Sequence, residues 1–180
     1  MKLHLCCGDV YLGGGFINCD ISGEIAEPGM TGTALENYYK DRHIGTGHKI
    51  YIDKRISILD FPWYFADESI DEIVMIEAIE HFTLSDAKKI TKEIYRILKS
   101  GGKLLIDFPD TEETINKYIE MNPDYCMRLI YGSQRDGFSW HRWGYTERTF
   151  MELMGDGWRF DFHGIVNHEY PTIGCEAVKK

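Results

Sequence analysis

Four residues of this 180-residue chain have the types and spacing of a metal site. Glu77, Glu80 and His81 stand at i, i+3 and i+4, so a helix beginning there would project all three from one face. Two carboxylates and an imidazole on one face can bind a divalent cation. His141, in the aromatic-rich run 139–146, is the candidate fourth ligand. We therefore expect a centre for Mg²⁺ or Mn²⁺, although two histidines would also admit Co²⁺ or Zn²⁺.

The same residues have an interpretation without a metal. Glu77 alone would face a ligand, Glu80 would cap a helix and His81 would pack in the interior. His141 would be a loop histidine held by the tryptophans on either side of it. Under this interpretation Glu77 still lies near the reacting groups, and His81 or His141 could act as the general base.

A second set of polar residues follows the segments that we predict to be strands. Gly8 comes after the first, Asp20 ends the second, Asp60 follows the third and Glu77 follows the fourth. Because sheets of parallel strands bind ligands beyond their carboxyl ends, we expect these residues at one edge. Glycine lets a ligand approach the backbone, and an acid ending the second strand can accept hydrogen bonds from ribose hydroxyls. A single Asp at a strand end is more often a turn or a helix cap.

The elements that would position these residues alternate between strand and helix patterns. Strands are predicted over 3–7, 15–20, 50–59, 70–76 and 103–108, helices over 84–99, 111–121 and 146–154, and a closing antiparallel pair over 158–163 and 172–178. Ser85 is expected to cap the helix over 84–99, and Gly101-Gly102 to end it. This order predicts an α/β fold, a Rossmann-like and mainly parallel sheet with helices on both faces.

The chain is expected to form a single domain over residues 1–180. Residues 22–48 are rich in glycine and are expected to be a loop insertion, with one possible helix over 34–41. Residues 122–145 are also expected to be a loop. Only about seven residues separate Gly8 from the second strand, so the first helix of such folds is expected to be missing.

Several blocks of the sequence, taken in order, resemble the class I S-adenosylmethionine-dependent methyltransferases, of the type 11-like kind. The blocks are Leu-His-Leu-Cys-Cys-Gly-Asp (3–9), Ile-Asn-Cys-Asp (17–20), Leu-Asp-Phe-Pro-Trp-Tyr-Phe-Ala-Asp-Glu-Ser-Ile-Asp-Glu-Ile (59–73), Ile-Glu-His-Phe (79–82) and Tyr-Arg-Ile-Leu-Lys-Ser-Gly-Gly-Lys-Leu (95–104). The resemblance implies S-adenosyl-L-methionine as cofactor. It also implies contacts with the cofactor at each strand end. Leu5, Cys6 and Gly8 would contact its methionine part, and Asp20 would bind its ribose. Asp60 and Phe61 would contact its adenine, and Glu77 and Ala78 would lie near its methyl group.

The later Glu-x-x-Glu-His motif, joined by His141, resembles two metal-assisted groups of this superfamily. They are the ubiquinone-pathway O-methyltransferases and the small-RNA 3′-terminal 2′-O-methyltransferases. In both, the implied metal holds neighbouring hydroxyls near the methyl donor.

The chain departs from the family pattern at its first strand. His4 stands where the family has an acid, and Cys6 stands where the family has its first glycine. A thiol side chain is therefore expected where the backbone should come close to the cofactor. A missing first helix would harm a dinucleotide site, because that helix holds the pyrophosphate. S-adenosylmethionine has no phosphate, and the chain has no G-x-G-x-x-G, so a methyltransferase is favoured over a nicotinamide oxidoreductase.

The leading hypothesis is methyl transfer to a hydroxyl of a small molecule, a sugar or a phenol. The net charge of −9 disfavours nucleic acid, although arginines at 128, 135 and 142 keep an RNA 2′-O-methyltransferase as an alternative. A cofactor-binding module without catalysis is a further alternative, because of Cys6. Five cysteines without a C-x-x-C pair, no signal peptide and no long apolar run predict a cytoplasmic protein with no membrane segment. The sequence does not indicate the oligomeric state.

Overall fold

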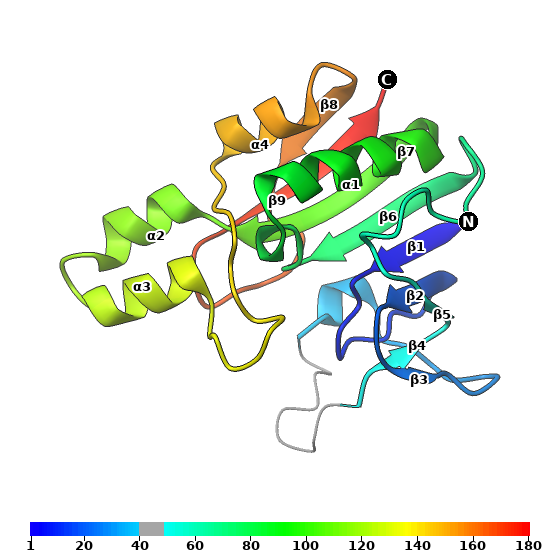
Figure 1. The fold of residues 1–180 in the computed structure, drawn as a ribbon, viewed down its shortest axis with the longest axis horizontal. Helices are drawn as coiled ribbons and strands as arrows, with labels where there is room; N and C mark the ends of the chain where they lie inside the picture. The colour runs from blue at the N-terminus through cyan, green and yellow to red at the C-terminus, as the bar shows by residue number, and fades with distance from the viewer. Residues whose placement is uncertain (40–48) are drawn as a thin grey trace.

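The computed structural model describes residues 1–39 and 49–180. Its centre is a seven-stranded sheet in the order β5-β2-β1-β6-β7-β9-β8 (Figure 1). The strands are β1 (Lys2–Leu5), β2 (Phe16–Asp20), β5 (Lys54–Arg55), β6 (Ile70–Ile76), β7 (Leu98–Pro109), β8 (Trp158–Phe162) and β9 (Thr172–Lys179). All pairs from β5 to β7 are parallel, and β9 is antiparallel to both its neighbours. The predicted α/β fold with a C-terminal antiparallel pair is confirmed.

The strand expected over residues 50–59 is broken in two. Its first part, β4 (Tyr51–Ile52), pairs with β3 (Glu24–Ile25) in a separate two-stranded sheet, and its second part is β5. The break falls at Asp53, whose carboxylate accepts hydrogen bonds from the backbone and side-chain amides of Asn18 and from Tyr11. Residues 56–59 then leave the sheet and turn toward its carboxyl edge.

One face of the sheet is covered by α1 (Leu84–Ile97) and α4 (Glu147–Met154), which bury a large apolar core against it. Thr83, not Ser85, caps α1, and its hydroxyl oxygen accepts the N–H of Asp86 at 3.2 Å. The expected glycine cap is also wrong. The helix ends at Ile97 and the chain enters β7 at once, so Gly101, with φ +75°, lies within the irregular start of that strand.

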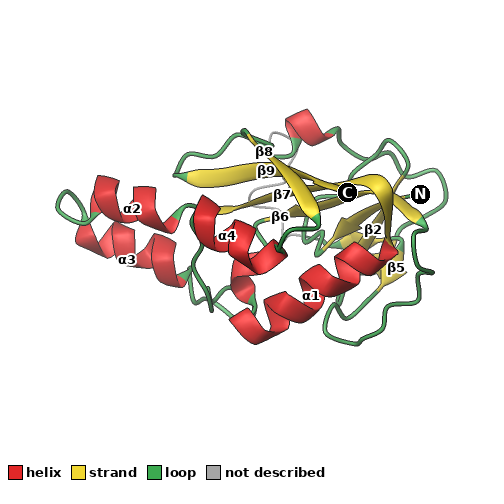
Figure 2. Cartoon of the chain, turned by 90° about the horizontal axis from the view of Figure 1, so that it is seen from above, coloured by secondary structure: helices red, strands yellow, loops and turns green. Residues whose placement is uncertain are grey.

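Among the described residues, the opposite face carries a short helical turn, η1 (Leu35–Asn37), and loops (Figure 2). A second apolar cluster joins Val10, Leu12 and Tyr38 to the β6 residues Val74 and Ile76. The described residues between β1 and β2 contain no helix, as the short spacing predicted. Helices therefore cover little of this face in the described part of the chain, and loops pack over most of it.

A helical hairpin projects beyond the carboxyl end of β7 (Figure 1). It consists of α2 (Thr111–Tyr118) and α3 (Pro123–Tyr131), so the expectation of a loop over 122–145 is wrong in its first part. Asn122 caps α3 by accepting the N–H of Tyr125 at 3.1 Å, and Pro123 occupies the first turn, where a missing N–H costs nothing. No helix in the described part of the chain combines the length and apolar character that crossing a membrane requires.

Candidate active site

An open cavity of about 520 Å³ lies at the carboxyl edge of the sheet, within the size range of small-molecule sites. Its walls come from the segments after β1, β2, β5 and β6 and from the loop before α4. They are formed by Cys6, Gly8, Asp20, Ile21, Ser22, Ile50, Ile56, Ser57, Ile58, Leu59, Glu77, Ala78, His81, Phe82, Thr83, Asp86, Asp136, Gly137, Phe138 and Arg142. The parallel topology therefore gathers residues that are far apart in the chain, as expected of such sheets.

The turn after β1 presents backbone to the cavity. Gly8 has φ +53°, and a Cβ added there would meet no protein atom within 4 Å. Its N–H donates to Oδ2 of Asp20 at 3.0 Å, and the N–H of Ser22 donates to Oδ1 at 3.2 Å. Asp20 is thus fixed at the end of β2, with its carboxylate at the cavity wall.

Cys6 also has a left-handed backbone, with φ +53°, which is uncommon for a residue other than glycine. Burial raises the pKa of the Cys6 thiol well above its usual range, and the negative charge of Asp20 raises it further. The side chain is therefore a protonated thiol at the cavity wall, not a nucleophile.

Five of the eight residues expected to contact a cofactor line this cavity: Cys6, Gly8, Asp20, Glu77 and Ala78. The other three do not. Leu5 is buried in the core, Asp60 is exposed with its N–H bonded to Ser57, and Phe61 stacks on Trp63 with ring centroids 6.1 Å apart. The segment just before Asp60 lines the cavity in their place.

Three of the four predicted metal ligands come together. Glu80, His81 and His141 each offer one ligand atom, and these atoms lie within 4.8 Å of one another. Glu80 and His81 belong to the helical turn η2 (Ile79–His81), which follows β6. His141 is held beside them because the next residue, Arg142, donates its N–H to the carbonyl of Glu80 at 2.7 Å. His81 also lines the large cavity, so the trio lies at its wall.

The two imidazoles are neutral at ordinary pH. Burial lowers the pKa of His81, and burial together with the charge of His81 lowers the pKa of His141 to about 4. Nδ1 of His81 lies 3.0 Å from the carbonyl oxygen of Trp140, which can only accept, so Nδ1 carries the proton. Nε2 of His81 is then left with a lone pair, 3.7 Å from Oε1 of Glu80.

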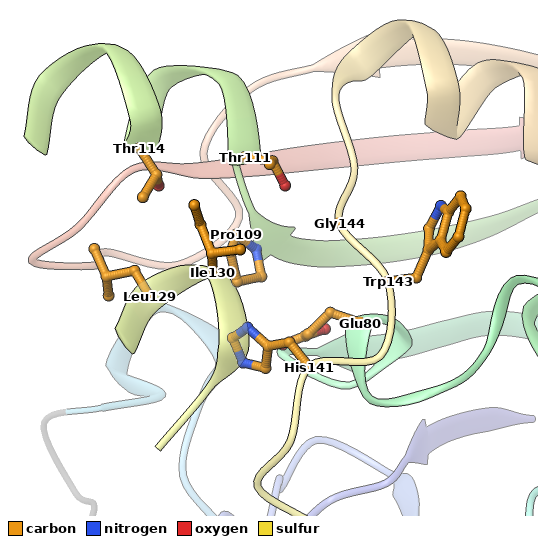
Figure 3. Close-up of a pocket in the computed structure, with 9 residues that line it drawn as sticks. All are labelled: Glu80, Pro109, Thr111, Thr114, Leu129, Ile130, His141, Trp143 and Gly144. Atoms are coloured by element: carbon orange, nitrogen blue, oxygen red, sulfur yellow. The ribbon is translucent and has the colours of Figure 1, made fainter. Parts of the chain in front are cut away.

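Glu80 is an acidic residue in a buried position. It is 1% exposed, and neither of its carboxylate oxygens has a hydrogen-bond partner among the described residues. Burial raises the pKa of the Glu80 carboxyl well above its usual range, and the charges of Glu77 and Asp107 raise it further. Figure 3 shows Glu80 beside His141. Both line a small cavity of about 10 Å³, to which Leu129 and Ile130 of α3 also contribute. A buried carboxylate in this state requires a proton or a cation.

Glu77 does not join this trio. Its left-handed backbone, with φ +49°, turns its side chain to a second group with Asp107 and His168, whose ligand atoms also lie within 4.8 Å of one another. Nε2 of His168 lies 2.8 Å from Oδ1 of Asp107, a close contact without the angles of a good hydrogen bond. Tyr170 donates its hydroxyl to Oε2 of Glu77. The expected helix does not begin at Glu77, so the i, i+3, i+4 argument fails for this residue.

Four residues of these sites had no predicted role. Asp107 and His168 belong to the second acid–histidine group, and Asp136 and Phe138 line the large cavity. Asp107 had a signal, because it interrupts an otherwise apolar strand pattern from Lys103 to Phe108. The others lie in loops, where neither periodicity nor spacing indicates which way a side chain points.

Comparisons with known proteins bear on the fold and on part of the chain. Residues 27–106 match the family described as "Methyltransferase domain". No curated protein matches the chain. A protein of Pyrococcus horikoshii OT3 is 20% identical, with a TM-score of 0.59 over 99% of this chain and 81% of that one.

A S-adenosylmethionine-dependent methyltransferase from Methanosarcina mazei is 16% identical, with a TM-score of 0.56 over 98% of this chain and 89% of that one. Human N-acetylserotonin methyltransferase, solved with S-adenosylmethionine, is 12% identical, with a TM-score of 0.59 over 99% of this chain and 47% of that one. At these identities the likeness establishes the fold. That fold is a methyltransferase-like α/β fold, and the match over residues 27–106 is a likeness to the methyltransferase domain family.

Proposed function

We propose that this protein transfers the methyl group of S-adenosylmethionine to a hydroxyl of a small molecule, assisted by a divalent cation. Glu80, His81 and His141 would hold the cation. The observation that carries the proposal is the Glu80 carboxylate, which is buried beside two neutral imidazoles with both oxygens lacking hydrogen-bond partners among the described residues.

The residues around the large cavity fit the methyl donor. Asp20 would accept hydrogen bonds from the ribose hydroxyls, and Gly8 would admit the donor close to the backbone. Glu77, which lines the cavity after β6, would complement a positively charged sulfonium. Bound S-adenosylmethionine supplies an electrophilic methyl whose carbon–sulfur bond breaks as the bond to the acceptor oxygen forms.

The donor set of the trio also fits a cation. One carboxylate and two imidazoles suit Mn²⁺, Co²⁺ or Zn²⁺ better than Mg²⁺, which prefers oxygen ligands. The carbonyl of Trp140 fixes the tautomer of His81 so that Nε2 faces Glu80, and such outer contacts are typical of histidine ligands. A bound cation would lower the pKa of an acceptor hydroxyl and so assist its deprotonation.

The protein's own task is then to orient the acceptor oxygen and to take its proton. His81 is the residue that joins the trio to the cavity, and its neutral imidazole can accept a proton if no cation occupies Nε2. Holding donor and acceptor in line would supply most of the rate enhancement.

The test combines calorimetry with turnover on a panel of sugars and phenols. We expect S-adenosylhomocysteine to bind and NAD not to bind. A chelator should abolish methylation and leave cofactor binding intact, and added Mn²⁺ should restore it. His141→Ala should behave like the chelator, whereas His163→Ala, an exposed histidine outside the trio, should not. Turnover that persists in chelator would remove the metal from the proposal, and cofactor binding without any turnover would favour a binding module.

A further inference from the structure

We propose that the methyl acceptor is an aromatic acid, with Arg142 pairing with its anionic group and Phe138 contacting its ring. This inference rests on the function proposed above and selects among the acceptor classes that it allows. It depends on the part of the cavity lining that the loop before α4 provides.

Arg142 brings positive charge to a cavity that otherwise carries acids. In the described part of the chain, it is the one lysine or arginine among the lining residues, whereas the acids are Asp20, Glu77, Asp86 and Asp136. Its backbone is fixed by the hydrogen bond from its N–H to the carbonyl of Glu80. Arg142 is thus held one residue from His141, next to the proposed cation site.

The guanidinium of Arg142 is available for a ligand. Its side chain is exposed, and among the described residues no carboxylate lies within ion-pair distance of it. Asp86, another residue of the cavity lining, already accepts from the Thr83 hydroxyl at 2.7 Å and from Lys89 at 3.2 Å. The guanidinium fork matches a carboxylate or phosphate in geometry and charge.

Phe138 offers an apolar surface in the same wall. Its side chain lines the cavity, and the residue is 73% exposed, so it is not part of the core. Its N–H donates to Oδ1 of Asp136 at 2.8 Å, and the N–H of Asp136 donates to the Ser139 hydroxyl at 3.1 Å. The turn therefore presents the aromatic ring in a defined place, where stacking on a planar ligand would remove apolar surface from water.

Asp20 and Glu77 suit the hydroxyls and the positive charge of the methyl donor. Arg142, the one cationic residue among the described residues of the lining, then suits an anionic group of the acceptor. A neutral sugar has neither an anionic group to pair with Arg142 nor an aromatic ring to stack on Phe138. An acid built on a phenol ring would use both, with its hydroxyl free to reach the trio.

The probes are 3,4-dihydroxybenzoate and catechol, which share two neighbouring hydroxyls and differ in the carboxylate. Their binding is measured by calorimetry on the full chain saturated with S-adenosylhomocysteine, with equimolar Mn²⁺. We expect the acid to bind roughly tenfold more tightly than catechol. Arg142→Gln should remove this preference, whereas Phe138→Ala should weaken both probes alike. Arg128→Gln, an exposed arginine on α3 outside the cavity, should leave both unchanged.

Other outcomes overturn the inference. Equal binding of the two probes, or binding of neither, would show that the site does not select an aromatic acid. Tighter binding of adenosine 5′-monophosphate than of the benzoate would indicate a ribonucleotide acceptor. A loss of S-adenosylhomocysteine affinity in Arg142→Gln, with the preference for the acid unchanged, would assign the guanidinium to the cofactor's carboxylate. Failure of S-adenosylhomocysteine to bind the wild type would instead contradict the proposed function itself.

Discussion

Tyr170 donates its hydroxyl to Oε2 of Glu77, so the loop before β9 holds the residue that follows β6. Burial and the charge of Glu77 raise the pKa of the Tyr170 phenol, which keeps it a donor. We expect Tyr170→Phe to lower the free energy of unfolding by about 1.5–3 kcal/mol, because a half-buried carboxylate loses a donor. Urea denaturation measures this. Tyr64→Phe, at a side chain 93% exposed, is the control, and equal stability of the two variants would contradict the prediction.

Asp20 is expected to contribute more to cofactor binding than Asp60. Asp20→Ala should weaken S-adenosylhomocysteine binding by about 1.5–3 kcal/mol, the value of a hydrogen bond to a charged group. Asp60→Ala should leave the affinity almost unchanged, because Asp60 does not line the cavity. Calorimetry on both variants checks the pair. If Asp60→Ala proves the more harmful, the adenine lies where the sequence alone suggested.

Glu80→Gln should make the metal-free protein more stable. The substitution keeps the side-chain shape but replaces an acid, whose ionised form is disfavoured by burial and by the charge of Glu77, with an amide that does not ionise. We expect a gain of about 1–3 kcal/mol in chelator. Added Mn²⁺ should then stabilise the wild type and not the variant. Thermal denaturation of the wild type and of Glu80→Gln tests this prediction, with Glu112→Gln on the exposed face of α2 as control. A less stable Glu80→Gln in chelator would mean that the carboxyl has a structural partner.

His4 should make the fold sensitive to acid. It is fully buried, its Nδ1 lies 3.0 Å from the side-chain Oδ1 of Asn18 and its Nε2 lies 3.2 Å from the Tyr38 hydroxyl. Burial lowers the pKa of His4 to about 4, although the Asn18 hydrogen bond raises it slightly.

The unfolded chain, with an ordinary histidine pKa near 6.5, therefore binds an extra proton between about pH 4 and 6.5. Stability should fall as pH falls through that window, by up to about 3 kcal/mol from His4 alone. His4→Gln, which keeps a donor and an acceptor, should flatten this part of the profile. Because other buried histidines titrate in the same range, the difference between wild type and variant is the relevant quantity, and parallel profiles would contradict the prediction.

The sequence predicted the fold better than the details of the site. Strand β6 was expected over its observed range, and Asp20 and Gly8 were expected at the carboxyl edge, because parallel strands place their ends together. The hydrophobic pattern of α1 was also sufficient to predict that helix. Its cap was misassigned by two residues because Thr83 and Ser85 are chemically equivalent candidates.

Glu77 shows why the rest could not be predicted. Its spacing to Glu80 and His81 suggested one helical face, and only a positive φ at a non-glycine residue turns it away. His168 and Tyr170, which lie beside the Glu77 side chain, come about ninety residues later in an irregular loop. No periodicity relates them to Glu77, so only the folded chain brings them together.

The place of β9 has a consequence for truncation of the chain. β9 lies between β7 and β8, and β8 pairs with β9 and with no other strand in the described part of the chain. Although β8 precedes β9 in sequence, it is joined to the sheet through β9 alone among the described strands. A cut within β9 would therefore cost the protein two strands.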